Sequence, residues 1–356
     1  MFKPSCEASK INEVREYKTV NMVKRLGVIT ANRIHLKNYP LDNPTMVFNS
    51  AMTIENGMAK FYARIILGYF TYASSVALIE IGLSDIYGGY VGSSHYPAEI
   101  VVYPNSKYDL WGVEDPRVSR INGKLVMTYC GRTVNYFNPA VRTERTLPVA
   151  AVLEGPRENW VKKCAFRFPE ELRRFVISDK DAFVARNRKG ELILFHRPHL
   201  TDERYYLAVS KIPKDFLSME NQKIEEVCIS DTKVLLEAAE FEMKLGWATP
   251  PVEVGSGECL VLVHGIDREI ECYRVFAVLM RCEDEVELTA ITPHYIMEPE
   301  MNYEVYGDRP YTVFPCGAQK VDDKLLISYG AADSALGIGE IKLDELLAVL
   351  DKHRLK

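Results

Sequence analysis

Two acidic residues, a proline and an arginine stand together between apolar residues in the segment LWGVEDPRVSR, residues 110–120. Pro116 fixes its own φ and disfavours helical geometry at Asp115, so the segment is predicted to be extended chain or a turn. Neighbouring side chains of extended chain point to opposite faces. We therefore expect one of Glu114 and Asp115 to face a pocket and the other to pair with an arginine. Taken alone, the segment is also explained by a solvated turn with a local ion pair.

Basic and histidine side chains recur where apolar segments end. Gathered at one place, they would suit a polar, partly anionic ligand. Arg132, Lys180 and a histidine of the HRPH segment, His196 or His199, could together hold phosphate or sulfate, because arginine offers a bidentate fork and lysine a point charge. Any one of these residues is also explained as an ordinary residue at a strand end. The polar residues at these strand ends are Arg64, Arg132, His196, Arg197, His199 and His264, together with one carboxylate, Asp333.

A repeat of polar turn followed by apolar strand would bring these residues together. The turns lie at Gly57, Gly123, Gly190, Gly257 and Asp323, at intervals of 66, 67, 67 and 66 residues. A unit of this length has room for four short strands, which is one blade of a β-propeller. Equivalent strand ends of all blades would then surround one mouth of the central channel. A pair of β-sandwiches is the rival arrangement, but it does not explain five equal units.

The expected fold is therefore all-β, a single five-bladed β-propeller with a short C-terminal helix. We assign residues 1–340 to the propeller and residues 341–356 to a helix packed on it. The leucines at 343, 346, 347 and 350 have the spacing of one helical face. The segment 168–178 is expected to hold a short helical turn between two blades.

Composition excludes several classes of function. The formal net charge of -5 gives no basic field for nucleic acid, and no apolar run approaches the roughly 18 residues of a membrane span. The eight cysteines form no CxxC pair, and the first residues have no apolar signal core. We expect a cytoplasmic protein with reduced, structural cysteines, Cys316 included, and no metal. The sequence contains no glycine-rich loop of the kind that would predict a bound nucleotide.

A series of motifs resembles glycoside hydrolase family 130, the β-mannoside phosphorylases and related mannosidases. The family is a five-bladed β-propeller, in agreement with the repeat. The resemblance runs from about residue 44 to residue 340. The matching segments are FNSAM, FYAR, GVEDPRV, YCGR, DKDAFV, FHRPH, GWATPPVEV, LVHG, YTVFPCGA and YGAADSALGIG.

The resemblance also implies roles for single residues. Asp115 matches the catalytic acid, which in the phosphorylases protonates the glycosidic oxygen through the 3-hydroxyl of mannose, with Glu114 and Arg117 as ion-pair neighbours. The phosphate clamp matches Arg132, Lys180 and His199, with His196 as an alternative to His199 and Arg145 as a weaker match. Residues that match the mannosyl subsite are Asn49, Ser50, Arg64 and Asp333; we add His264 from its strand-end position.

The choice of reaction depends on charge. An inverting hydrolase needs a second carboxylate to activate water, whereas a phosphorylase needs cations that hold phosphate. The sequence presents the cations and no obvious second carboxylate, so we expect a manno-oligosaccharide and inorganic phosphate to give α-mannose 1-phosphate, without a cofactor. The alternatives are a hydrolase with Glu240 or Glu242 as base, a mannosyltransferase, and a non-catalytic glycan-binding propeller. The sequence does not decide the linkage, the acceptor sugar or whether the chain forms a homo-oligomer.

Overall fold

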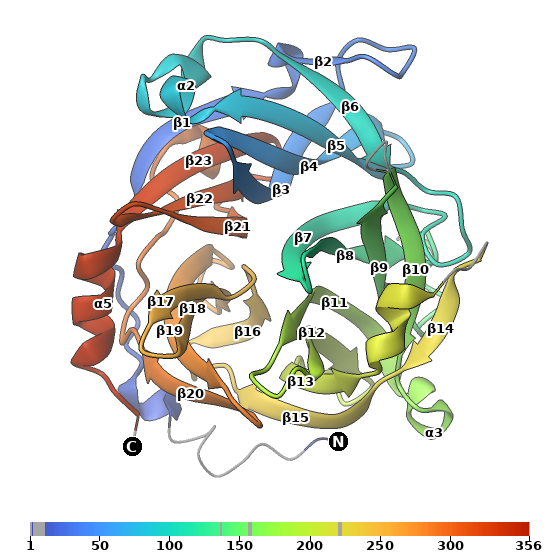
Figure 1. Ribbon diagram of the computed structural model, residues 1–356, viewed down its shortest axis with the longest axis vertical. Helices are drawn as coiled ribbons and strands as arrows, with labels where there is room; N and C mark the ends of the chain where they lie inside the picture. Colours follow the sequence, from blue (N-terminus) through green and yellow to red (C-terminus); the bar gives the residue numbers. More distant parts are fainter. Residues whose placement is uncertain (1, 3–10, 136, 156–158, 220–222, 356) are drawn as a thin grey trace.

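Five sheets, each a blade of four or five strands, form a ring around a central axis (Figure 1). The computed structural model describes residues 2, 11–135, 137–155, 159–219 and 223–355. The chain is thus a five-bladed β-propeller, as the repeat predicts. Within each blade the strands pair antiparallel from the axis outward, except that the short edge strands β2 and β14 pair in parallel with their neighbours.

The strands of blades 1 to 3 have the following bounds. Blade 1 holds β3 (Met46–Glu55), β4 (Met58–Gly68), β5 (Ala73–Gly82), β6 (Tyr96–Val102) and the short edge strand β2 (Ile34–Leu36). Blade 2 holds β7 (Val113–Ile121), β8 (Lys124–Arg132), β9 (Thr146–Glu154), β10 (Asn159–Arg167) and β14 (Glu225–Cys228). Blade 3 holds β11 (Val176–Arg186), β12 (Leu192–Leu200), β13 (Leu207–Ile212) and β15 (Ser230–Leu236).

The other two blades complete the ring. Blade 4 holds β16 (Glu242–Trp247), β17 (Val252–Gly255), β18 (Glu258–Asp267), β19 (Tyr273–Cys282) and β20 (Val286–Ile291). Blade 5 holds β21 (Val313–Val321), β22 (Lys324–Ala331), β23 (Ala335–Lys342) and β1 (Lys24–Thr30). The helices given for the described residues are α2 (Leu83–Tyr87), α3 (Glu170–Arg173), α4 (Asn302–Val305) and α5 (Leu343–Asp351), with short 3-10 turns at Asn12–Val14, Ala31–Arg33, Tyr90–Gly92 and Lys214–Ser218.

The five turns of the sequence repeat occupy equivalent places. Each joins the innermost strand or strands of a blade to the next strand outward, as β3 is joined to β4 and β21 to β22. Gly57 and Gly123 have φ of 76° and 79°, in the left-handed region where glycine carries no steric penalty. In the fifth turn Asp322, with φ of 52°, adopts this conformation. The predicted equivalence of the turns is confirmed.

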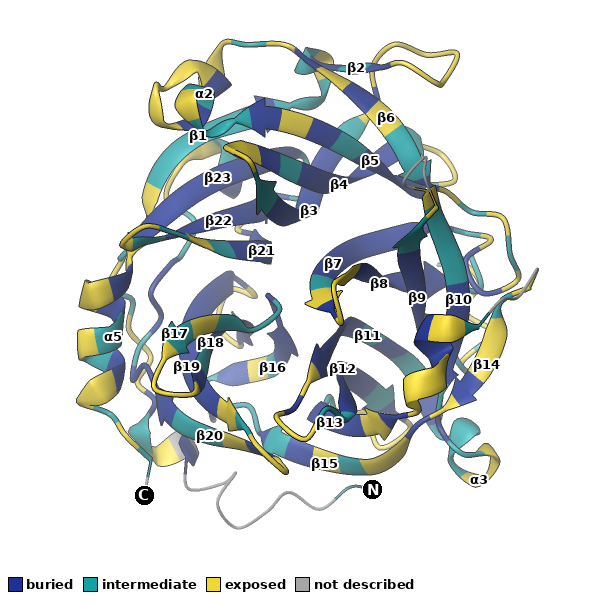
Figure 2. Ribbon diagram, in the orientation of Figure 1, coloured by how far each residue is buried: buried dark blue, intermediate teal, exposed yellow. Residues whose placement is uncertain are grey.

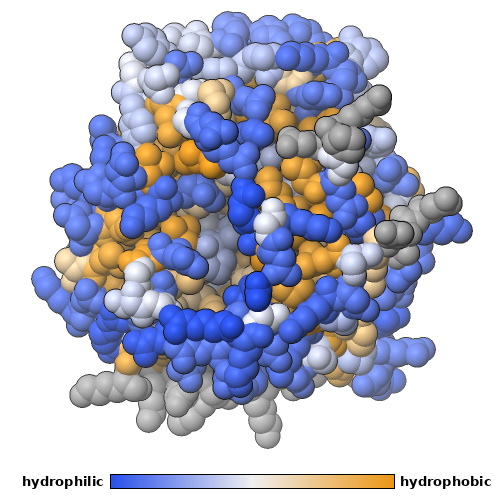
Figure 3. All heavy atoms as spheres, viewed as in Figure 1, coloured by the Kyte–Doolittle hydropathy of each residue, from blue (hydrophilic) through white to orange (hydrophobic). Residues whose placement is uncertain are grey.

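The core lies between the blades. Phe61 and Ile79 of blade 1 pack in one apolar cluster with Leu326 and Ile338 of blade 5. Figure 2 shows that the strands near the axis are largely buried, whereas exposed residues gather on the outer strands and loops. On the face drawn in Figure 3, hydrophilic side chains cover much of the surface and apolar atoms appear between them. The blade-to-blade packing therefore fixes where the strand ends lie around the axis.

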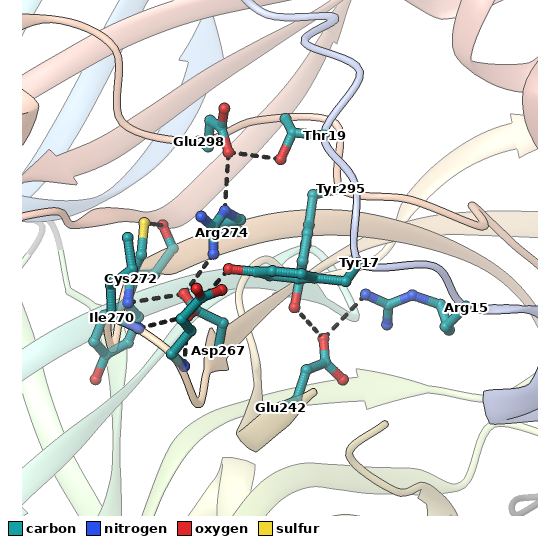
Figure 4. A network of polar contacts seen from close by, with 12 residues as sticks. Arg15, Tyr17, Thr19, Glu242, Asp267, Ile270, Cys272, Arg274, Tyr295 and Glu298 are labelled. Atoms are coloured by element: carbon teal, nitrogen blue, oxygen red, sulfur yellow. Dashed lines mark hydrogen bonds and ion pairs between the residues drawn. The ribbon is translucent and has the colours of Figure 1, made fainter. Parts of the chain in front are cut away.

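The N-terminal part of the chain closes the ring. Strand β1 pairs antiparallel with β23, so that the N-terminal strand is the outer strand of the last blade. The segment before β1 is tied to blade 4 by polar contacts (Figure 4). Arg15 Nη2 lies 3.0 Å from Glu242 Oε1, and both side chains are buried. The hydroxyl of Tyr295 donates to the same carboxylate oxygen at 2.6 Å. Further along the segment, the hydroxyl of Thr19 donates to Glu298 at 2.7 Å.

Helix α5 follows β23 and packs on the propeller as expected. Leu343, Leu346 and Leu350 are buried, and Leu347 packs against the same cluster. Helix α3 lies inside the segment where a helical turn was predicted. In the described part of the chain, no helix is long and apolar enough to span a membrane.

Candidate active site

A pocket of about 330 Å³ lies where the innermost strands begin and the second strands of the blades end. It is lined by side chains from blades 1, 2, 3 and 5, together with Tyr273 from blade 4. The lining residues are Asn49, Arg64, Tyr72, Glu114, Asp115, Lys180, Asp181, Arg197, Tyr273, Asp308, Arg309, Thr312, Phe314 and Asp333. Strand ends of different blades thus meet at one mouth, as the sequence repeat predicts.

Three equivalent β-bulges direct polar side chains into this pocket. Asn49, Asp115 and Asp181 are spaced 66 residues apart and have φ of 42°, 48° and 53°. Each lies where the pairing of the innermost strand with the second strand shifts register. A bulge re-aims a side chain, and a non-glycine residue in this region carries backbone strain that the fold must offset. One structural device, used in three successive blades, therefore builds the pocket.

Asp115 is held in the pocket by two side-chain hydrogen bonds. Its Oδ1 accepts hydrogen bonds from Asn49 Nδ2 at 2.8 Å and from Arg64 Nη1 at 3.0 Å. Burial alone would raise the pKa of Asp115, but the charges of Arg64 and Arg117 and the Asn49 hydrogen bond outweigh burial. The pKa of Asp115 therefore lies below its ordinary value, and the carboxyl is ionised near neutral pH.

The expectation that only one acid of the pair faces the pocket is wrong. Glu114 and Asp115 both line it, because the bulge at Asp115 breaks the strict alternation of an extended strand. Glu114 Oε1 lies 2.6 Å from Arg64 Nη2 and 3.4 Å from Arg132 Nη1. Arg117 Nη1 donates to the carbonyl oxygen of Asp115 at 2.9 Å, and its charge acts on the Asp115 carboxyl. Arg64 and Arg132 take the ion-pair role for Glu114.

Asp333 lies on the turn after β22 and lines the same pocket. Burial, followed by the negative charge of Asp115, raises the pKa of Asp333 to about 6, although Arg64 and Arg309 act in the opposite direction. Asp115 and Asp333 thus have pKa values shifted in opposite directions. Such a difference between neighbouring carboxyl groups is typical of sites that manage a proton.

Asp181 is a site residue that the sequence reasoning missed. Its carboxylate accepts from Arg197 Nε at 2.5 Å, lies 3.6 Å from Arg117 Nη2 and lies 3.4 Å from His264 Nε2. The expectation of no second carboxylate in these strands is therefore wrong. Burial opposes ionisation, but the charge of Arg197 and the hydrogen bond with His264 hold the pKa of Asp181 well below its ordinary value. The interval of 66 residues from Asp115 is the sequence signal that would have found it.

Cations gather on the side of the pocket formed by blade 3 and the loop before β21. Lys180, Arg197 and Arg309 line the pocket. Among the described residues, neither Lys180 nor Arg309 forms an ion pair. Lys244 of β16 lies close enough to Arg197, Lys180 and Arg309 for their charges, after burial, to lower the pKa of Lys244 to about 6. Arg309 and Lys244 were not expected from the sequence. This arrangement suits a small anion.

Two members of the predicted phosphate clamp lie behind the pocket wall. Arg132 is fully buried, and its Nη1 donates to the carbonyl oxygen of Tyr72 at 3.0 Å. His196 is also fully buried, with Nδ1 at 2.8 Å from Asp179 and Nε2 at 2.8 Å from Ser210. Neither side chain lines the pocket. Their positions therefore do not fit a direct contact of Arg132 or His196 with phosphate in this pocket.

The structure also places Arg145 and His199 outside the pocket lining. Arg145 Nη1 donates to the carbonyl oxygens of Asn138 and Val141. His199 lies nearer the cations: its ring stacks on Tyr205 with centroids 4.1 Å apart, and the guanidinium of Arg197 lies over the same tyrosine ring. Of the predicted clamp, only Lys180 lines the pocket.

The predicted mannosyl-binding residues divide in a similar way. Asn49, Arg64 and Asp333 line the pocket. Ser50 is fully buried, and its hydroxyl donates to the carbonyl oxygen of Ala51 at 2.7 Å. His264 is buried behind Asp181, where burial lowers the pKa of His264 to about 4. Ser50 and His264 therefore support the pocket wall.

Neither proposed hydrolytic base lies at the pocket. Glu242 is held by Arg15 and Tyr295 in the network of Figure 4, and Glu240 is exposed outside the pocket lining. A larger cavity of about 520 Å³ lies between β6 and β10 and contains none of the residues discussed above. In the part of the chain that the structure describes, no group of three His, Cys, Asp or Glu side chains could hold a metal ion.

A protein-family model and several known proteins match this chain. The model of glycoside hydrolase family 130, described as beta-1,4-mannooligosaccharide phosphorylase, matches residues 13–352. A beta-1,2-mannobiose phosphorylase of Thermoanaerobacter sp. (strain X514) is 30% identical over 251 residues, covering 70% of each chain.

Solved structures share the fold. Beta-1,2-mannobiose phosphorylase from Listeria innocua, in complex with beta-1,2-mannobiose, superposes with a TM-score of 0.69 at 19% identity, covering 93% of this chain and 97% of that one. Another structure, described with family 130 glycoside hydrolases that target beta-1,2 mannosidic linkages in Candida mannan, has a TM-score of 0.62 at 16% identity, covering 91% and 96%. The structural neighbours therefore include one protein described as a phosphorylase and another described with glycoside hydrolases.

Proposed function

Because the chain belongs to glycoside hydrolase family 130, the β-mannoside phosphorylase family, we propose that it cleaves a β-mannosidic bond with inorganic phosphate. The products are α-mannose 1-phosphate and a shortened sugar. Phosphate attacks the anomeric carbon from the face opposite the departing oxygen, the bond from that carbon to the glycosidic oxygen breaks, and a proton goes to the departing oxygen. The anomeric configuration inverts.

The observation that carries this proposal is the cation group beside Asp115. Lys180 and Arg309 line the pocket without an ion-pair partner among the described residues, and Arg197 lies with them. Cations that lack an ion-pair partner in a partly buried pocket are costly unless an anion joins them. Phosphate in this place needs no general base, because it is already an anionic nucleophile. The clamp we propose is Lys180, Arg197 and Arg309 in place of the Arg132, Arg145 and histidine set.

Asp115 supplies the proton in this proposal. Its pKa lies below the ordinary value, so the bound substrates must raise this pKa before Asp115 can act as an acid. A phosphate dianion beside it does so by like-charge repulsion, and the sugar does so by removing water. The contacts from Asn49 and Arg64 hold the carboxylate in place while its charge state changes.

A β-1,2-linked manno-oligosaccharide is the substrate we propose. The support comes from relatives described as acting on β-1,2-linked mannosides, including the one that is 30% identical. The family model is described by a β-1,4 activity, so the linkage needs its own test. Incubation with β-1,2-, β-1,3- and β-1,4-mannobiose, each with and without phosphate, tests reaction and linkage together. We expect mannose 1-phosphate from the β-1,2 isomer, and only when phosphate is present.

Hydrolysis is the second candidate, because Asp308 and Asp333 add carboxylates to the pocket. Asp308 is exposed and accepts a hydrogen bond from the hydroxyl of Tyr72 at 2.7 Å. Free mannose released equally well without phosphate would identify a hydrolase and contradict the proposed phosphorolysis. No turnover of any mannobiose would favour a glycan-binding protein or a transferase that needs an activated donor.

A further inference from the structure

Lys244 stands out among the charged residues near the pocket. It lies on β16 of blade 4, is only partly exposed, and forms no ion pair with any residue in the described ranges. Its Nζ lies 4.9 Å from the centroid of the Tyr205 ring. The guanidinium carbon of Arg197 lies 5.2 Å from the centroid of the same ring. Lys244 and Arg197 therefore share one aromatic ring, and of the two only Arg197 has an ion-pair partner, Asp181, in the described ranges.

The groups that act on Lys244 come from several elements. Lys180 and Asp181 are on β11, Arg197 is on β12, and Arg309 is on the loop between α4 and β21. Burial is the largest influence and lowers the pKa of Lys244 to about 6, with the three cations acting in the same direction. Asp181 acts in the opposite direction, but it is already paired with Arg197. His199, stacked on Tyr205, feels the charge of Lys244 as well.

Resting on the proposed function, we infer that Lys244 is a phosphate-linked proton acceptor: its neutral amine takes one proton from the solvent when phosphate enters the cation group. A dianion among Lys180, Arg197 and Arg309 offsets their repulsion on the ammonium form and adds an attraction to it. The proton adds to Nζ of Lys244, and no covalent bond to phosphorus forms or breaks. Lys244 and phosphate together then carry one negative charge fewer than phosphate alone. Without phosphate the cation group thus avoids a fourth positive charge, and with phosphate it gains one.

Calorimetry of phosphate binding tests this inference. Inorganic phosphate is titrated into the protein at about pH 8, in two phosphate-free buffers that differ in ionisation enthalpy, so that proton uptake is measured directly. For the wild type we expect uptake approaching one proton per phosphate. Lys244→Arg, whose guanidinium is always charged, should bind phosphate with clearly less proton uptake than the wild type. Lys244→Met should lose uptake and bind phosphate roughly tenfold or more weakly, since a charge-assisted contact is absent.

A surface lysine provides the matched control. Lys233 on β15 is about half exposed and pairs with Glu285, so Lys233→Met should behave as the wild type. Equal proton uptake by the wild type and Lys244→Arg would overturn this inference while leaving phosphorolysis in place. If the wild type binds no phosphate, the proposed function fails and the inference fails with it. Thermal unfolding of each variant identifies loss of fold, and Lys244→Arg keeps the test decisive if Lys244→Met does not fold.

Discussion

Asp115 and Asp333 lie in one pocket and hold their protons differently because their neighbours differ. Asp115 receives hydrogen bonds from Asn49 and Arg64, whereas no side chain in the described ranges donates a hydrogen bond to the carboxyl of Asp333. Asp333 also faces the negative charge of Asp115. Near neutral pH Asp115 is therefore a carboxylate, while Asp333 gains a proton in mildly acidic solution.

The first prediction at the residue scale concerns the acid. Asp115→Asn keeps the size of the side chain but cannot transfer a proton. General acid catalysis is worth typically about 10²–10⁴-fold, so kcat for phosphorolysis should fall by at least that order. Mannose 1-phosphate release and thermal unfolding are measured together, the second to verify the fold. Turnover near that of the wild type would mean that another group supplies the proton.

Asp333 gives a prediction about pH and stability. Its pKa of about 6 in the folded state exceeds the ordinary value of 3.8, so the folded state binds the proton more tightly than the unfolded state. Its contribution to stability is therefore present below about pH 4 and is lost as pH rises to about 6. The free energy of unfolding of Asp333→Asn lacks this dependence on pH. Relative to the wild type, it should therefore increase by about 2 kcal/mol when the pH is raised from 4 to 7. Denaturant unfolding at both pH values measures the difference, and a difference that is the same at both would contradict the assignment.

At the scale of the strand, the bulges explain which site residues the sequence could predict. Pro116 marks Asp115 as irregular, and the 66-residue interval would have extended that reading to Asn49 and Asp181. Strict strand alternation misplaced Glu114, because the bulge turns both acids to one side. In the regular strand β12 alternation holds: Arg197 lines the pocket, whereas the neighbouring His196 faces Asp179 and Ser210.

The cations that the sequence did not reveal lie where the repeat gives no guidance. Arg309 is on the loop between α4 and β21, away from any strand end, and only the folded chain brings it to Tyr273. Lys244 is on the short innermost strand of blade 4, and nothing in its own segment distinguishes it from a surface lysine. The period fixes the ring and the mouth of the channel. Loop conformation and blade-to-blade packing then decide which side chains meet there.

Strand β16 gives the prediction at this scale. A Cβ at Gly246 would overlap His264 Nε2 and Asp181 Oδ2, so Gly246→Ala must displace the pair. Overpacking of this kind costs typically 1–3 kcal/mol, and the shift of Asp181 should also release Arg197 and raise the KM for phosphate. Gly92→Ala is the matched control, because no atom lies within 4 Å of the added carbon. Wild-type stability and phosphate KM in Gly246→Ala would show that the pair does not need this space.

For the whole molecule, the ring depends on a strand that the repeat does not contain. The five units account for β3 to β23, whereas β1 precedes the first unit and completes the last blade. A period in the sequence predicts a closed ring, since closure removes sheet edges, but it does not say which segment makes the closure. The polar contacts of Arg15 and Tyr17 with blade 4, and of Thr19 with Glu298 on the chain that follows β20, hold the segment that leads into β1 (Figure 4).

The last prediction tests this closure through Arg15. Arg15→Met keeps an apolar chain near Phe276, over whose ring the guanidinium carbon lies at 3.6 Å, but it leaves the fully buried Glu242 with the Tyr295 hydroxyl. Removing one partner of a buried ion pair costs typically about 3–5 kcal/mol. Denaturant unfolding should show a loss of this size, and adding Glu242→Gln should restore part of it. The exposed Lys24, paired with Glu340, is the control: Lys24→Met should change stability by at most about 1 kcal/mol. An Arg15→Met protein as stable as the Lys24→Met protein would mean that the segment before β1 does not secure the ring.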